Sequence, residues 1–388
     1  MQFNHLLFAK KIKKEITRSN LLIVRLGAIG DVIRTLPSVA LLKTNYPKAR
    51  ITYLVEEFSL DIVRNSPIID EIIVVPRKRW AKYAKSITCL PLILKESKDI
   101  ISCLHKKRFL ISFDMHGIFK SGVLSYLSGA KYRVGFAKKF SREFNHLFSS
   151  IHITPSSSSK TRIEQNIDIV RPFINSFISI QKESDLVDLM LDPDESLAIA
   201  PFLSIIKSNK EKGRLVVGIN PFASKRGGYK TWPIHMYVYL GLKMAKELNA
   251  FVYVTYGPSE IKHAKELARI GGGHILLAPK TTLKALGYII KQSDLFVTGD
   301  TGPMHLAGIL GTKVAAIFGP SDPVLNYPPG KGHIIIYEKV PCSPCRNRKC
   351  MIRLCLNSIN SEHVFKRIKP HLNTIKEIKV RQFEIEPS

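Results

Sequence analysis

The stretch from residue 293 to residue 323, SDLFVTGDTGPMHLAGILGTKVAAIFGPSDP, constrains the fold more than any other part of the chain. Residues 294–297 predict a short strand, residues 299–302 a tight turn, and residues 304–310 a helix. Residues 313–318 then predict the next strand. A strand, a glycine turn, a helix and a second strand make half of a parallel α/β layer, so the chain is predicted to be an α/β protein.

The turn before this predicted helix suits a phosphate group. Pro303 occupies the first helical position, and a helix N-terminus offers unpaired N–H groups and the positive end of the helix dipole. Asp300 would repel a phosphate if its side chain pointed the same way, so we expect it to bind sugar hydroxyls. An ordinary strand-turn-helix corner explains the same residues without a ligand, and these residues alone leave both interpretations open.

Composition narrows the class of protein. The chain has 388 residues, of which 45% are hydrophobic, and this length and composition favour two soluble α/β domains over one. No apolar run reaches the ~18 residues that a membrane span needs. Six cysteines without a secretory signal indicate a reducing compartment, so we expect a cytoplasmic protein.

The formal net charge of +28 implies an anionic partner, which is nucleic acid, an acidic membrane face or an anionic substrate. The charge is dispersed along the chain and no nucleic-acid-binding signature is present. Nucleic-acid binding is therefore the alternative from another class of function. It predicts a steep salt dependence and no binding of nucleoside diphosphates.

Residues 1–20 form a basic N-terminal extension with two interpretations. The segment is an amphipathic helix that lies on anionic lipid, or it is a frayed, solvated extension. Its basic residues alternate with apolar ones, and they are Lys10, Lys11, Lys13, Lys14 and Arg18.

A second glycine turn follows the first predicted strand, residues 21–26. The turn reads Gly-Ala-Ile-Gly-Asp over residues 27–31, and residues 32–46 predict a helix that Pro37 kinks or restarts. The carboxyl end of a strand is where open α/β sheets bind ligands, although the pattern is not GxGxxG. Asp31 is a charge favoured by the helix dipole, or a carboxylate presented to a ligand.

Strands and helices alternate twice along the chain, which predicts two domains of the same kind. The polar stretch 192–213 interrupts the alternation, which restarts with a strand at residues 215–219. We therefore expect a first domain over residues 21–191, a linker with a short helix over residues 192–213, and a second domain over residues 214–388.

Four motifs in this order resemble glycosyltransferase family 9, the lipopolysaccharide heptosyltransferases. They are GAIGDV at residues 27–32 with TLP at residues 35–37, KTWP at residues 230–233, DTGPMHLA at residues 300–307, and FGPSDP at residues 318–323. The resemblance implies a GT-B fold, in which two Rossmann-like domains have parallel sheets that face a central cleft. It also implies acceptor binding mainly by the first domain and nucleotide-sugar binding by the second.

The resemblance further implies an inverting, metal-independent transfer of heptose from ADP-heptose to the inner core of lipopolysaccharide. Asp31 matches the family's catalytic base, and Lys230 matches its phosphate-contacting lysine. Thr301 and Gly302 match the amides that bind the diphosphate, and Asp300 matches the residue that holds heptose hydroxyls. Transfer of another nucleotide-activated sugar to a different surface glycan is the alternative within the same class.

Further residues are candidates on both sides of the reaction. On the donor side, Glu260 matches the ribose-binding residue, and His305 either contacts the donor or packs within its own helix. On the acceptor side, the alternative to acceptor binding is that the candidate residues only form ion pairs at the edge of the site. The remaining donor-side candidates are Ser224 and Thr281, and the acceptor-side candidates are Arg25, Gly30, His116 and Lys120.

These expectations imply a nucleotide-sugar donor and a lipopolysaccharide precursor or similar anionic glycolipid as the acceptor. We expect a monomer without a cofactor or catalytic metal, in peripheral contact with the cytoplasmic face of the membrane. A C-x₂-C-x₄-C-x₄-C pattern leaves one question open, because four thiolates in a short loop either bind a structural zinc ion or remain reduced thiols. These cysteines are Cys342, Cys345, Cys350 and Cys355.

Overall fold

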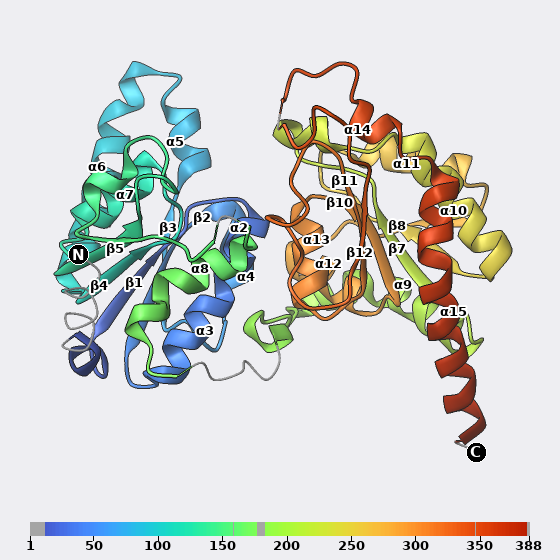
Figure 1. The fold of residues 1–388 in the computed structure, drawn as a ribbon, viewed down its shortest axis with the longest axis horizontal. Coiled ribbons are helices and arrows are strands. Elements are labelled where there is room, and N and C mark those ends of the chain that lie inside the picture. Colours follow the sequence, from blue (N-terminus) through green and yellow to red (C-terminus); the bar gives the residue numbers. More distant parts are fainter. Residues whose placement is uncertain (1–11, 158, 177–182, 346, 386–388) are drawn as a thin grey trace. The chain divides into compact units, whose positions relative to one another are not determined.

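The computed structural model describes residues 12–157, 159–176, 183–345 and 347–385. The chain divides into two compact units, Met1–Asp188 and Leu189–Ser388. Each unit contains one six-stranded sheet with helices packed on both of its faces (Figure 1). All strand pairs in both sheets are parallel. The predicted α/β architecture is therefore present in both halves.

The first sheet is built around β1, whose five residues pair with β2 on one side and β4 on the other. Its strands, in spatial order, are β3 (Glu71–Val75), β2 (Arg50–Glu56), β1 (Asn20–Val24), β4 (Ile111–Asp114), β5 (Tyr132–Phe136) and β6 (Ile151–Ile153). Its helices are α2 (Ile29–Ile33), α3 (Leu36–Asn45), α4 (Leu60–Val63), α5 (Arg77–Tyr83), α6 (Leu90–Lys106), α7 (Phe119–Leu127) and α8 (Arg162–Val170).

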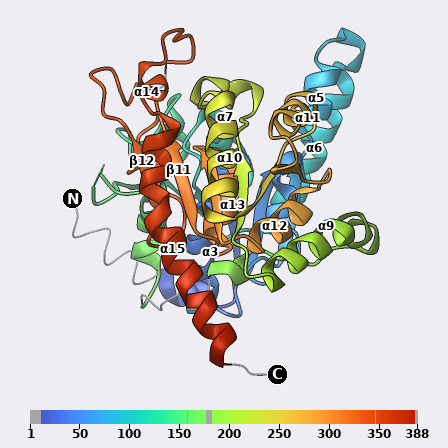
Figure 2. The same ribbon diagram turned by 90° about the vertical axis from the view of Figure 1, so that its right-hand side faces the viewer.

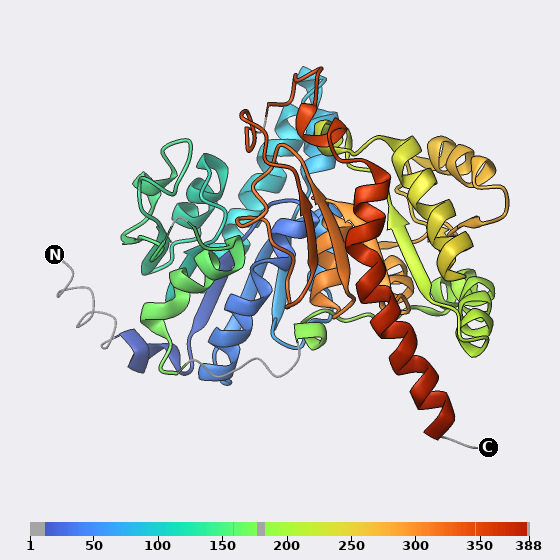
Figure 3. The same ribbon diagram turned by 45° about the vertical axis from the view of Figure 1, so that its right-hand side comes forward.

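Alternate residues of these strands face opposite layers of helices. Leu22, Val24 and Leu54 pack with Leu104 of α6 in one cluster, which Leu124 of α7 also contacts. On the opposite face, α3 and α8 contact each other and lie side by side (Figures 1 and 3). Because both faces are covered, the strands read as continuous apolar runs in the sequence.

The second sheet follows the same plan. Its strands, in spatial order, are β12 (Ile334–Tyr337), β11 (Val314–Phe318), β10 (Leu295–Gly299), β7 (Val216–Asn220), β8 (Phe251–Val254) and β9 (Ile275–Leu277). Its helices are α9 (Pro193–Glu211), α10 (Ile234–Leu248), α11 (Ile261–Ile270), α12 (Leu283–Lys291), α13 (Gly302–Ile309), α14 (Leu354–Asn357) and α15 (Ser361–Ile385).

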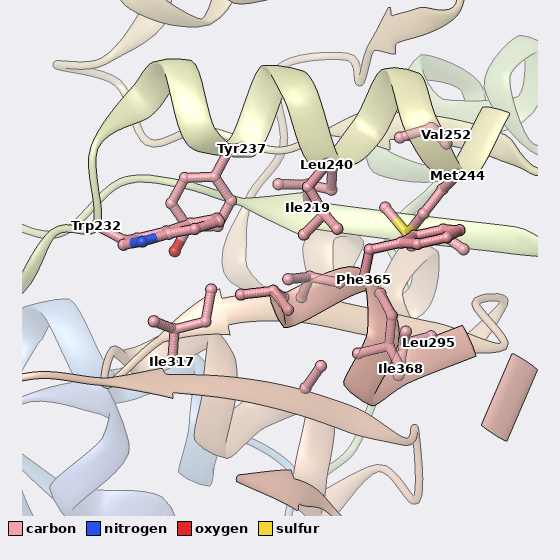
Figure 4. Packing of buried hydrophobic residues seen from close by; sticks show 14 of the residues in the cluster. Ile219, Trp232, Tyr237, Leu240, Met244, Val252, Leu295, Ile317, Phe365 and Ile368 are labelled. Atoms are coloured by element: carbon pink, nitrogen blue, oxygen red, sulfur yellow. The ribbon is translucent and has the colours of Figure 1, made fainter. Parts of the chain in front are cut away.

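A large core cluster lies between this sheet and the helices α10 and α15, which contact each other along one face (Figure 2). Figure 4 shows Trp232 beside Tyr237 and above Ile317, and Met244 beside Phe365 of α15. The Trp232 indole N–H donates to the carbonyl of Ile359, 2.8 Å away, so this buried ring has no unsatisfied donor. The tryptophan of the KTWP motif therefore fixes the loop that carries Lys230.

Two predicted segments differ from the observed fold. Residues 192–213, expected as a linker with a short helix, contain the 19-residue helix α9, and the division between the units falls before it. Asp192 caps this helix by accepting from the N–H of Glu195, and Ile199, Phe202 and Ile206 pack on the sheet. The polar residues that suggested a linker lie at the helix ends and on its exposed face.

The N-terminal segment also differs from both interpretations, as far as it is described. Ile12 and Ile16 are fully buried, and the Lys13 ammonium donates to the carbonyl of Ile174. Residues 12–19 are therefore packed onto the first unit and do not offer these isoleucines to lipid. Residues 1–11, which carry Lys10 and Lys11, lie outside the described residues. Among the described helices, none is both long and apolar enough to cross a membrane.

Candidate active site

Each sheet changes its winding direction once, and Asp31, Lys230 and Asp300 lie in the segments that follow the strands at these two points. In the first sheet, the order β3-β2-β1-β4 places the change between β1 and β4. In the second, the order β10-β7-β8 places it between β10 and β7. Loops that leave neighbouring strands in opposite directions make room for a ligand at such a switch point.

At the first switch point, Asp31 lies in α2 directly after the loop that leaves β1. Its Oδ2 is 3.0 Å from Nη2 of Arg25, and its Oδ1 pairs with Nη2 of Arg34. Burial disfavours its charged form, but the guanidinium groups of Arg25 and Arg34 outweigh burial and hold the pKa of Asp31 well below its usual range. Asp31 is therefore an ionised carboxylate with 28% of its side chain exposed.

Arg25 connects the two sides of this switch point. Its Nη1 donates to the carbonyl of Met115, which follows β4, while its Nε is buried without a hydrogen-bond partner among the described residues. His116 comes next in the chain, and burial, followed by the charge of Arg25, lowers its pKa to about 2. The imidazole is therefore neutral at physiological pH and can donate or accept a hydrogen bond without carrying charge.

Asp114 holds the backbone that presents His116. Its carboxylate accepts from the N–H groups of His116 and Gly117, from the Ser121 hydroxyl and from the Asn145 amide, at 2.6 to 3.1 Å. Burial raises the pKa of this carboxyl. Asp114 is consequently engaged in the turn after β4, and its role is to shape that turn.

Lys120, on the first turn of α7, belongs to a second ion cluster beside the first. Its ammonium pairs with Oε1 of Glu56, and Oε2 of the same carboxylate lies 3.0 Å from Nη1 of Arg77. Glu56 is 1% exposed, whereas Lys120 and Arg77 keep 41% and 43% of their side chains exposed. A buried carboxylate thus holds two half-exposed cations near the carboxyl edge of the first sheet.

Arg34, Glu56 and Arg77 take part in these ion pairs but were not among the predicted site residues. Arg34 lies three residues after Asp31 in a predicted helix, where side chains meet on one face, so the spacing was a usable signal. Glu56 ends an apolar strand, but its pairing with Arg77 and Lys120 joins segments far apart in sequence. Gly30, predicted on the acceptor side, is buried within α2.

At the second switch point, Lys230 and Asp300 form the central pair. The Lys230 ammonium is 2.5 Å from Oδ2 of Asp300, and Nε2 of His305 is 3.9 Å from Oδ1. Burial opposes the charge of Asp300, but Lys230 and then His305 lower the pKa of this carboxyl below its usual value. These residues come from the loops after β7 and β10 and from the first turn of α13.

The helix α13 begins one residue earlier than the sequence predicts, at Gly302 instead of Pro303. Thr301 is its extended N-cap residue and uses its hydroxyl to contact that of Thr298, 3.2 Å away, without capping the helix. Gly302 is the first helical residue, followed by Pro303. The first N–H groups of a helix have no partner within it, so this end is suited to an anion.

The other donor-side candidates lie at the carboxyl ends of neighbouring strands. Glu260 follows β8, precedes α11 and receives the Ser259 hydroxyl at 2.6 Å. Ser224 is exposed in the loop after β7. Thr281 is half-buried after β9, and its neighbour Thr282 performs the capping of α12. The structure thus brings Lys230, Asp300 and His305 into one cluster and gives Ser224 and Thr281 no contact with it.

The thiols of the four-cysteine loop lie at different depths in the structure. Cys342 and Cys345 are exposed, Cys350 is half-buried and Cys355 is buried in the core beside α15. Burial, followed by the proximity of the other three thiols, raises the pKa of Cys355. Within the described parts of the chain, His, Cys, Asp and Glu form no group of three or more that could hold a metal ion.

The fold and its two switch-point clusters define a protein of two Rossmann-like units, each with a polar site at the carboxyl edge of its sheet. The chain belongs to glycosyltransferase family 9 (heptosyltransferase), whose family model matches residues 99–355. The resemblance drawn from the four motifs is confirmed, and the protein is a heptosyltransferase-like glycosyltransferase.

Individual proteins agree with this assignment. The chain is 26% identical over 318 residues to the lipopolysaccharide core heptosyltransferase OpsX of Haemophilus influenzae, covering 80% of this chain and 81% of that protein. It is 24% identical to lipopolysaccharide heptosyltransferase 1 of Campylobacter coli, covering 89% of this chain and 97% of the relative. E. coli heptosyltransferase WaaC, solved with ADP-2-deoxy-2-fluoro heptose, superimposes with a TM-score of 0.67 at 21% identity, covering 91% and 99% of the two chains. The expected GT-B fold is confirmed.

Proposed function

We propose that the protein transfers heptose from ADP-heptose to the inner core of lipopolysaccharide, with inversion at the anomeric carbon and without a metal ion. The observation that carries this proposal is the pairing of opposite charges at both switch points. Asp31 offers an ionised carboxylate in the acceptor-side unit, and the Lys230–Asp300 pair lies beside a helix N-terminus in the other. The proposed reaction needs both groups to act on one pair of substrates.

On the donor side, the diphosphate lies at the N-terminus of α13 with Lys230 as its counter-ion. Positive charge that is fixed in place before the reaction stabilises the leaving ADP as negative charge develops on it. Asp300 accepts hydrogen bonds from heptose hydroxyls, and its pairing with Lys230 helps to hold the pKa of the Asp300 carboxyl below its usual value. Glu260 accepts from the ribose hydroxyls, since a carboxylate has two oxygens for two donors.

On the acceptor side, an acceptor hydroxyl attacks the anomeric carbon while the bond from that carbon to the ADP oxygen breaks. The hydroxyl proton passes to Asp31, and ADP leaves with the electron pair of the broken bond. Asp31 is a weak base, because Arg25 and Arg34 stabilise its charge. Proton transfer therefore occurs late, when the new carbon–oxygen bond has made the hydroxyl strongly acidic.

The nature of the substrates is inferred from the relatives and from charge. The Haemophilus influenzae relative is a lipopolysaccharide core heptosyltransferase, and the WaaC structure holds an ADP-heptose analogue. An acceptor that carries phosphate and carboxylate groups matches Arg25, Lys120 and Arg77 at the edge of the first sheet. We place the enzyme in the cytoplasm, as a monomer at the inner face of the membrane where such a glycolipid is exposed.

A donor screen tests the proposal. Purified protein is mixed with lipopolysaccharide that lacks heptose and with ADP-heptose or a UDP-sugar, with and without a chelator, and the released nucleotide is quantified. We expect ADP release that requires both ADP-heptose and the acceptor and persists with the chelator. The product linkage, read by nuclear magnetic resonance, should have the anomeric configuration opposite to the donor. Release of UDP, or a retained configuration, would contradict the proposal.

A further inference from the structure

The helices α5 and α6 form a hairpin in which several large apolar side chains are exposed to solvent. No residue of α5 is buried, and Leu104, near the far end of α6, is the buried residue of that helix. Ile87 in the turn is 86% exposed and Leu94 is 64% exposed, and Leu90 and Leu92 are exposed as well. Figures 1 and 2 draw the hairpin in cyan, extending beyond the strands of the first sheet.

These exposed residues are separate from those that hold the hairpin together. The Trp80 indole N–H donates to Oε2 of Glu96, 2.7 Å away, and joins α5 to α6. Arg79 pairs with the same carboxylate at 3.1 Å. Trp80 and Ile100 pack against the core of the first unit. These contacts explain how the two helices are joined and anchored to the first unit. They do not involve the exposed apolar residues at the tip of the hairpin.

The hairpin is also strongly basic. Residues 77–98 contain one acidic side chain, Glu96, which is engaged by Trp80 and Arg79. A protruding segment that combines exposed aliphatic residues with an excess of cations has the chemistry of an interfacial membrane segment. The seven cations are Arg77, Lys78, Arg79, Lys82, Lys85, Lys95 and Lys98.

The base of the hairpin is connected to the acceptor-side residues. Arg77, the first residue of α5, pairs with Glu56, whose other oxygen pairs with Lys120. Lys120 is in turn close enough to His116 to lower its pKa, although less than burial does. A partner surface that binds the hairpin therefore lies next to the residues that are proposed to bind the acceptor.

We propose that residues 77–98, the docking hairpin, bind the surface of an anionic lipid bilayer by inserting Ile87, Leu90 and Leu94 among the acyl chains. The lysines and arginines around them pair with acidic headgroups. Two other occupants fit less well. A second copy of the hairpin brings the same seven positive charges, and nucleic acid leaves the aliphatic side chains in water. The link to catalysis rests on the proposed lipid-anchored acceptor, whereas bilayer binding itself does not.

Vesicle co-sedimentation of the whole protein tests bilayer binding directly. Vesicles of phosphatidylcholine alone are compared with vesicles that also contain phosphatidylglycerol. We expect binding to the second kind only, reduced at least about tenfold in the variant Ile87→Asp/Leu94→Asp. Lys82→Glu/Lys85→Glu should weaken binding by about fivefold for each residue or more, since one basic residue near an anionic surface contributes about that factor.

The matched control is Leu197→Asp, because Leu197 is 75% exposed on α9 in the second unit. This variant should bind vesicles as the unchanged protein does, and circular dichroism should show all variants folded. Absence of binding to anionic vesicles, or equal loss in the control, overturns the proposal. Binding that depends on salt but survives Ile87→Asp/Leu94→Asp also overturns it, because dispersed charge then suffices. Dimers that disappear in the hairpin variants would identify a second copy as the occupant.

An activity comparison separates this inference from the proposed function. Hairpin variants should keep the kcat/KM of the unchanged protein with a delipidated acceptor in solution and lose at least about tenfold with the acceptor embedded in anionic vesicles. Equal loss with both acceptors would contradict a docking role. If no variant, including the unchanged protein, transfers heptose to either acceptor, the proposed function fails while the vesicle result stands.

Discussion

The ammonium of Lys230 lies 2.5 Å from Oδ2 of Asp300, across the point where the second sheet reverses its winding. The two residues are 70 positions apart and come from loops after different strands. The pair places both charges next to the N-terminus of α13, where we propose that the diphosphate of the donor meets a cation whose position is already set.

Replacing Lys230 with Ala should weaken ADP binding and lower kcat/KM by about 10²- to 10³-fold, the range found when one preorganised charge-stabilising group is removed. The measurements are calorimetric titration with ADP and steady-state kinetics. Lys246→Ala, at an exposed position on α10, is the matched control. Wild-type ADP affinity in Lys230→Ala would remove this lysine from the donor site.

Asp300 is nearly buried, with 6% of its side chain exposed, so Lys230→Ala also leaves a carboxylate without its main partner. The double variant Lys230→Met/Asp300→Asn removes both charges. It should recover most of the melting temperature lost by Lys230→Ala and none of the activity. Recovery of activity in the double variant would show that the pair serves stability alone.

Gly257 provides a second test on the donor side. A Cβ atom added there would meet Oε2 of Glu260 at 2.4 Å, so Gly257→Ala must displace that carboxylate. We expect weaker ADP binding with an unchanged melting temperature. If displacement of Glu260 is the cause, combining Gly257→Ala with Glu260→Gln should weaken ADP binding little more than Glu260→Gln alone. Additive losses would argue against Glu260 as the affected group.

Glu56 allows a prediction about stability, because one partner of its ion cluster is buried and the other two are not. Arg77→Gln/Lys120→Gln leaves a buried carboxylate unpaired and should cost about 3–5 kcal/mol of unfolding free energy. Glu56→Gln leaves cations that water can solvate, and should cost less. Urea denaturation of the three proteins measures both values. The reverse order would mean that Glu56 is readily hydrated.

The pH dependence of activity follows from the ion pairs of Asp31. Its pKa is depressed, so the carboxylate stays ionised and the unchanged protein should show no acid limb in kcat/KM above about pH 4. The stability from its ion pairs is present above the unfolded pKa and is lost as pH falls through the lower folded value. His116, with a pKa of about 2, adds no limb at neutral pH.

Arg34→Gln removes one of the two guanidinium groups, so burial then counts for more and the pKa of Asp31 should rise. We expect an acid limb of kcat/KM to appear at higher pH than in the unchanged protein. Kinetics on the acid side of neutrality, with urea denaturation at each pH to exclude unfolding, provide the test. An unshifted profile would contradict the electrostatic description of Asp31.

The sequence predicted much of this fold because both faces of each sheet are covered. Buried parallel strands then appear as short apolar runs, such as residues 21–26, separated by glycine turns. The strand β12 was not predicted, although residues 334–337 are apolar, because the chain around it offers loop signals. The 17-residue helix α6 was also not predicted, although its apolar and polar residues follow a helical period.

Candidate site residues that lie in family motifs could be predicted from the sequence. Residues that join the site through ion pairs between distant segments could not. Asp31, Lys230 and Asp300 are named by local motifs, and the structure pairs the last two. The pairing of Glu56 with Arg77 and Lys120 depends on strand order, which local patterns do not determine. The same holds for Arg25 and the carbonyl of Met115, which meet only because β1 and β4 are neighbours.

Replacement of Asp31 is the most direct test of the catalytic proposal. Turnover of Asp31→Ala and Asp31→Asn is measured with ADP-heptose and acceptor, alongside ADP affinity by calorimetry, which verifies that the second unit is folded and intact. We expect turnover to fall by about 10²- to 10⁴-fold, the usual contribution of a general base, with ADP affinity nearly unchanged. Turnover close to that of the unchanged protein in either variant would contradict the assignment of Asp31 as the base.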